Sequence, residues 1–140
     1  YRMYRRFQAE GRPLGFRVGR FEEDVRREME AVRTGREPGP LLGPSLYVRH
    51  LKRWLDVFGP ERLRVWFTEH LADPHTAART LDEILAYLEL APFDYSDLVR
   101  KWYNKAPKAN LPKGIEQALK AFFAPWNEAL ADLLGVKLPW

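Results

Sequence analysis

The sequence predicts an α/β protein that is mostly helical and contains one core strand. Two observations support this fold class. Apolar residues recur every three or four positions over several stretches, as they do in helices that bury one face. Residues 62–67 are instead a short run rich in strand-forming side chains, and the helix-start pair Asp73-Pro74 follows closely. A strand followed by a helix is a unit of α/β folds.

The first third of the chain is predicted to hold two helices. Residues 1–10 have a helical pattern, and glycines and a proline then interrupt the chain. The second helix carries three acids in its first turn, where the positive end of the helix dipole favours them. Its buried stripe is expected to consist of Phe21, Val25, Met29 and Val32. Residues 35–44 are rich in proline and glycine, and we expect an irregular loop there.

The next elements are predicted from apolar spacing and stop signals. From position 45 an apolar stripe runs to Phe58, where Gly59-Pro60 should end the helix. Residues 62–67 are too few for a helix and are expected to form one strand. A lone strand cannot form a sheet, because its backbone donors and acceptors need neighbouring strands. We therefore expect the partner strands to come from elsewhere in a longer protein.

Two more helical regions complete the prediction. Asp73 should cap a helix whose apolar stripe continues to Leu90. After a basic loop, residues 113–123 return to helical spacing. Pro125 is expected to start a separate helical segment, because proline inside a helix removes a hydrogen bond. That segment should end at Gly135.

The bulk composition limits the class of protein. The chain has 140 residues, of which 46% are hydrophobic and 30% charged, so one compact domain with a core is expected. It has no cysteine, which excludes disulfides and thiolate chemistry and suits a cytoplasmic location. No apolar run approaches the roughly 20 residues that cross a bilayer. The net charge of +4 favours an anionic ligand.

Four stretches resemble a known family when they are taken in order: residues 45–55 (SLYVRHLKRWL), 63–74 (LRVWFTEHLADP), 84–90 (ILAYLEL) and 119–135 (LKAFFAPWNEALADLLG). The order is similar to that of sulfotransferases that use 3'-phosphoadenosine 5'-phosphosulfate, including bacterial enzymes and domains that act on glycosaminoglycans. The chain departs from the family at Ser45-Leu46 and at Glu89, where glycine is usual.

The resemblance implies a P-loop-like sulfotransferase fold, with residues 1–140 as the C-terminal portion of one domain. In the family, a strand-to-helix turn and a lysine bind the 5'-phosphosulfate through backbone amides. No such turn occurs in this sequence. We therefore expect the N-terminal phosphosulfate-binding part to be absent, the catalytic base to lie before Tyr1, and the chain alone to be inactive.

The resemblance also assigns candidate site residues. Asn104, Lys105 and Lys108 correspond to a basic loop near the 3'-phosphate of the nucleotide, although a solvated loop would have the same composition. Tyr47 corresponds to a family tyrosine on a helix that faces the cleft, and His50, one turn on, could face the acceptor. The acceptor would bear a hydroxyl or an amine and would be a carbohydrate or a small metabolite. A core tyrosine and a surface histidine are the structural alternatives. The co-substrate implies no metal.

A second class of function stays open from the sequence. A non-catalytic helical module could bind nucleic acid or a protein partner through its arginines and aromatic side chains. The acids at positions 22–24, 28 and 30 interrupt the arginines, which weakens any continuous surface for a phosphate backbone. Exposed apolar stripes would indicate a protein partner, but strands missing from the chain would leave the same apolar surface.

Overall fold

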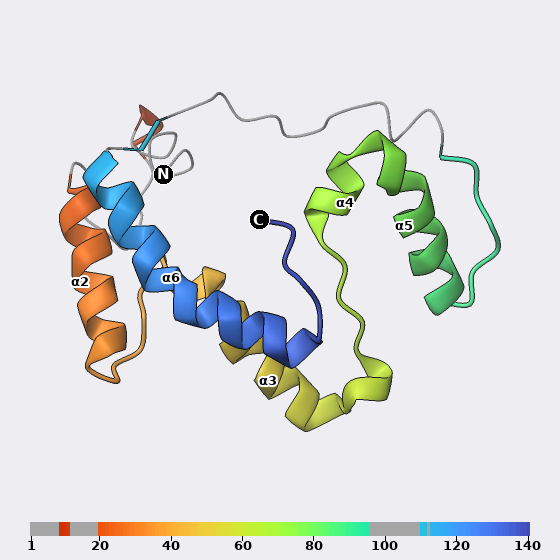
Figure 1. The fold of residues 1–140 in the computed structure, drawn as a ribbon, viewed down its shortest axis with the longest axis horizontal. Helices are drawn as coiled ribbons and strands as arrows, with labels where there is room; N and C mark the ends of the chain where they lie inside the picture. The colour runs from red at the N-terminus through yellow and green to blue at the C-terminus, as the bar shows by residue number, and fades with distance from the viewer. Residues whose placement is uncertain (1–8, 12–19, 96–109, 112) are drawn as a thin grey trace. The chain divides into compact units, whose positions relative to one another are not determined.

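The computed structural model describes residues 9–11, 20–95, 110–111 and 113–140 (Figure 1). Its regular elements are all helical. They are α2 (Phe21–Arg33), the 3-10 turn η1 (Gly43–Ser45), α3 (Tyr47–Phe58), η2 (Pro60–Arg62), α4 (Thr68–Ala72), α5 (Pro74–Tyr87) and α6 (Lys113–Leu134). The chain divides into two compact units, Tyr1–Val57 with Ala106–Leu138 and Phe58–Lys105 with Pro139–Trp140. The expected single domain stays a prediction.

The first unit is built around one apolar core. The core joins α2, the loop that follows it and α6, and Figure 1 shows α2 running beside the first part of α6. These segments meet because each has an apolar face that has to leave water. The buried core residues are Val25, Met29, Leu42, Leu46, Ile115 and Phe122.

The helices of the first unit begin and end close to the predicted positions. α2 covers the predicted stripe, and α3 ends at Phe58 where Gly59 adopts a φ of 79°. Glycine adopts that left-handed conformation without the strain that a Cβ would bring. α6 likewise ends at Gly135, which has a φ of 64°. The first helix was predicted over residues 1–10. Residues 1–8 lie outside the described part of the chain, so the structure describes only residues 9 and 10 of that range.

The predicted α/β fold is wrong for the part of the chain that the structure describes, because that part contains no strand and no sheet. Residues 63–67 have extended backbone at both ends, since Leu63 and Phe67 lie in the β region. Within the described ranges, no neighbouring segment forms a ladder with them. Their aromatic rings pack edge to face instead, Trp66 on Tyr87 and Phe67 on His70 and Trp140. Strand-forming side chains can therefore be accommodated in an irregular segment.

The predicted break at Pro125 is also wrong. α6 continues through this residue without interruption from Lys113 to Leu134. A proline in a helix interior costs about 3 kcal/mol, because one hydrogen bond is lost and the ring crowds the preceding turn. Phe122 and Leu130 are buried on either side of the proline. Their burial, at about 1.5–3 kcal/mol each, is large enough to offset that cost.

The second unit holds α4 and α5, which are adjacent in the chain and pack together. Asp73 caps α5 as predicted, since its Oδ1 accepts a hydrogen bond of 3.0 Å from the amide of His75. The helix ends at Tyr87, three residues before the predicted end, and Glu89 takes a φ of 56°. Within the described ranges, no helix is both long enough and apolar enough to cross a membrane.

Candidate functional site

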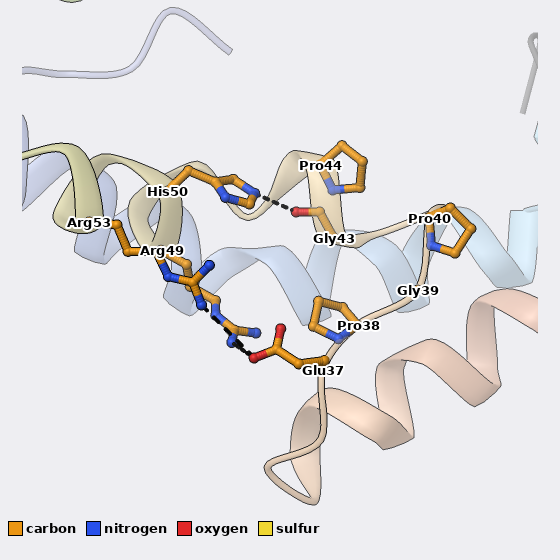
Figure 2. A pocket seen from close by; sticks show the side chains of 9 residues that line it. All are labelled: Glu37, Pro38, Gly39, Pro40, Gly43, Pro44, Arg49, His50 and Arg53. Carbon is orange, nitrogen blue, oxygen red and sulfur yellow. Dashed lines mark hydrogen bonds and ion pairs between the residues drawn. The ribbon is translucent and has the colours of Figure 1, made fainter.

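A pocket of about 530 Å³ lies in the first unit, between the loop after α2 and the first two turns of α3 (Figure 2). The loop contributes proline rings and glycines, and the helix contributes two arginines and a histidine. The walls are therefore largely apolar, with positively charged groups on the α3 side. The lining residues are Glu37, Pro38, Gly39, Pro40, Gly43, Pro44, Arg49, His50 and Arg53.

A buried carboxylate fixes the loop that forms one wall of the pocket. Glu28 of α2 is only 5% exposed, and its two oxygens accept hydrogen bonds from the amides of Leu41 and Leu42, the latter at 2.8 Å. A buried carboxylate is stable only when such donors satisfy it. A Cβ at Gly39 would overlap the Glu28 carboxylate, so glycine is needed there. The amide of Gly43 then donates to the carbonyl of Gly39, which closes the turn into η1.

The charged side of the pocket has two guanidinium groups and one carboxylate. Arg49 Nη2 lies 2.9 Å from Glu37 Oε1, and Arg53 Nη2 lies 4.0 Å from the same oxygen. Arg49 and Arg53 are one helical turn apart on α3, so their side chains share a face. One positive charge is left uncompensated by the groups that line the pocket.

His50 lines the pocket and is oriented by a backbone carbonyl. Its Nε2 lies 2.9 Å from the carbonyl oxygen of Gly43. A carbonyl can only accept, so Nε2 carries the proton in this contact. In the neutral imidazole, Nδ1 is then an acceptor that can bind a hydroxyl or an ammonium group of a ligand.

Tyr47 is not a member of the pocket lining, although the sequence placed it with His50. It begins α3, one turn before His50, and 51% of its surface is exposed. The three residues expected at the 3'-phosphate, Asn104, Lys105 and Lys108, lie outside the described residues. Of the two predicted site residues that the structure describes, His50 lines the pocket and Tyr47 does not.

Sequence reasoning missed the arginines and the acids of this region. Arg49 and Arg53 occur four residues apart beside a loop of prolines and glycines, and that combination is visible in the sequence. The burial of Glu28 is not visible, because an acid in a helix rich in charge is usually solvated. Asp24 is also buried: its Oδ1 pairs with Arg27 at 2.7 Å, and its Oδ2 has no hydrogen-bond partner.

The described residues contain no group of three His, Asp or Glu side chains arranged to hold a metal ion.

No family model matches the sequence, and comparisons with curated proteins and with solved structures gave no match. The four stretches and the pocket are therefore the features of this chain that bear on its function.

Proposed function

We propose that the chain takes part in sulfuryl transfer from 3'-phosphoadenosine 5'-phosphosulfate to a hydroxyl or amine of a carbohydrate or small metabolite. The observation that carries the proposal is the pocket at the start of α3. His50, which lies one helical turn after the tyrosine that the resemblance places at the cleft, lines this pocket beside Arg49 and Arg53. A site for this reaction needs these two kinds of group together.

The reaction explains why a group that binds the acceptor and positive charges are needed in one site. The acceptor oxygen or nitrogen attacks sulfur, the bond from sulfur to the phosphate oxygen breaks, and the acceptor proton passes to a general base, which the resemblance places before Tyr1. Negative charge develops on the sulfuryl oxygens and on the leaving phosphate, so fixed cations near these atoms lower the barrier. Holding the acceptor in line with sulfur contributes as well. In the proposal, His50 Nδ1 accepts a hydrogen bond from the acceptor, and the guanidinium groups supply positive charge.

The donor half of the proposal concerns Asn104, Lys105 and Lys108, which we assign to the 3'-phosphate by resemblance. Lysine is a suitable point charge for a phosphate, and each such contact contributes roughly 1.5–3 kcal/mol. The donor site and the pocket can be tested separately, because 3'-phosphoadenosine 5'-phosphate binds without any transfer.

The test is calorimetric titration of 3'-phosphoadenosine 5'-phosphate into the 140-residue protein. We expect binding, and a loss of about tenfold or more in affinity when Lys105 and Lys108 are both changed to alanine. The matched control changes Lys52 and Lys137, two exposed lysines, so that the net charge falls equally. No binding by the unchanged protein, or equal losses in the two variants, would contradict the proposal.

A helical module that binds a protein partner is the second candidate. It is favoured by apolar side chains that the second unit exposes after α5, namely Leu88, Leu90 and Phe93. A nucleic-acid surface has less support, because several basic side chains are paired with acids, as in Arg20 with Glu23 and Lys120 with Glu116. The protein-binding alternative predicts no response to the nucleotide in the titration above.

A further inference from the structure

The carboxylate of Glu37 lies in the pocket at the place where the acidic group of a ligand would meet the arginines. Glu37 is 74% exposed, whereas its partner Arg49 is 28% exposed. Glu37 also belongs to the loop, so it reaches the guanidinium groups from across the pocket (Figure 2). An ion pair this open to solvent contributes little to stability. A ligand can therefore displace the Glu37 side chain at little cost.

The guanidinium groups keep binding capacity beyond Glu37. Each arginine has five N–H donors in a planar fork that suits two oxygens of one acidic group. Glu37 makes one contact of 2.9 Å with Arg49 through a single oxygen, and its distance of 4.0 Å to Arg53 is too long for a hydrogen bond. Most of the N–H groups on this face can therefore bind an anion.

The other walls indicate what the anion is attached to. Pro38, Pro40 and Pro44 present rigid apolar rings, and Gly39 and Gly43 contribute backbone to the same wall. A volume of about 530 Å³ exceeds what a bare inorganic anion needs. A ring-shaped organic body would fill the space against the prolines, while its acidic group meets the arginines.

We propose that this pocket binds a ring-bearing organic anion through Arg49 and Arg53, and that Glu37 is a built-in counterion which the carboxylate or sulfate of the ligand replaces. The inference extends the proposed function, since it makes the acceptor an acidic molecule. It does not require the nucleotide, so the two proposals can fail separately.

The experiment is an NMR titration of the 140-residue protein with glucuronate, following the amide signals of Gly39 and Gly43. Glucose is the uncharged probe of the same ring size, and inorganic sulfate is the anion without a ring. We expect saturable shifts with glucuronate, none with glucose, and weaker binding of sulfate. Binding of glucose equal to that of glucuronate would overturn the role of the arginines, and sulfate binding as tight as glucuronate would overturn the role of the ring.

Variants of the charged groups give the sharper test. Glu37→Gln removes the competing charge and should tighten glucuronate binding by about threefold to fivefold. Changing Arg49 and Arg53 together to alanine should weaken it by about tenfold or more. The matched control is Glu83→Gln, which breaks the exposed Arg79 pair in the second unit and alters the net charge equally. Affinity that is unchanged or weaker in Glu37→Gln, or an equal gain in Glu83→Gln, overturns the inference.

The glucuronate titration and the nucleotide titration together separate this inference from the proposed function. Tighter glucuronate binding in Glu37→Gln, together with no binding of 3'-phosphoadenosine 5'-phosphate, supports the anion site and contradicts the sulfotransferase. Nucleotide binding that depends on Lys105 and Lys108, with no response to glucuronate, supports the sulfotransferase and contradicts the anion site.

Discussion

Replacing Glu28 by alanine should destabilise the first unit more than any change to an exposed acid of α2. The substitution removes the acceptors for the amides of Leu41 and Leu42. A hydrogen bond to a charged group contributes about 1.5–3 kcal/mol, and a buried donor left without a partner costs about 1–3 kcal/mol. Leu41 is half-buried, so water can reach its amide after the change, and we expect a net loss of about 3 kcal/mol.

The assay is urea unfolding of the variant and the unchanged protein, with the midpoint as the readout and the slope as a check on two-state behaviour. The matched control is Glu30→Ala on the exposed face of α2, which should change the stability by less than about 0.5 kcal/mol. A midpoint for Glu28→Ala equal to that of the control would refute the reasoning, because Glu28 would then not hold the loop.

A double-mutant cycle with Gly39 tests the geometry directly. Gly39→Ala should cost about 1–2 kcal/mol, because the added methyl group overlaps the Glu28 carboxylate. In the Glu28→Ala background the overlap is gone, so the same change should cost at least about 1 kcal/mol less. Costs that simply add would show that the two residues do not contact each other.

Three further predictions concern the other helices. Asp73→Ala should lower stability by about 1 kcal/mol through loss of the cap on the His75 amide, whereas Asp73→Asn should retain most of it; thermal unfolding followed by circular dichroism measures both. Pro125→Ala should raise the free energy of unfolding by about 1–3 kcal/mol, since it restores a helical N–H, and a lower free energy of unfolding in urea would contradict this. Partial burial and the Asp82 carboxylate, which accepts the phenol hydrogen, raise the pKa of Tyr95 to about 12 from 10.0. The protonated Tyr95 should therefore contribute its full stabilisation below pH 10.0, and this contribution should be lost as the pH rises through about 12. The absorbance of the phenolate measures the titration, and a midpoint near 10.0 would contradict the prediction. The same pH dependence of stability in Tyr95→Phe would contradict it as well.

The helices were predictable because their signals are local. α2, α3 and the cap of α5 depend on apolar spacing, on acids near a helix start and on particular residues such as Gly59 and Asp73. These effects act within one or two turns. The end of α6 at Gly135 belongs to the same class, because glycine adopts the left-handed conformation most easily wherever the helix lies.

Residues 63–67 show where local signals fail. β propensity measures how well a side chain fits a half-buried surface, and a ladder still needs a second segment. Here Trp66 and Phe67 find other aromatic rings, and no ladder forms in the described part of the chain. Pro125 is the opposite case, in which burial of neighbouring side chains on α6 outweighs an unfavourable local preference.

Part of the candidate site was also predictable from the sequence, and part was not. The sequence identified His50 as a residue that could face a ligand, and the order of four stretches supplied the hypothesis of sulfuryl transfer. The sequence could not show that Arg49 and Arg53 both face the carboxylate of Glu37, which lies twelve or more residues earlier in the loop. Nor could it show that the buried Glu28 of α2 binds the backbone of that loop. Periodicity and caps are properties of neighbouring residues, and the sequence determined them by itself. The burial of an acid and the meeting of distant charges depend on how helices pack, and only the tertiary structure decided them.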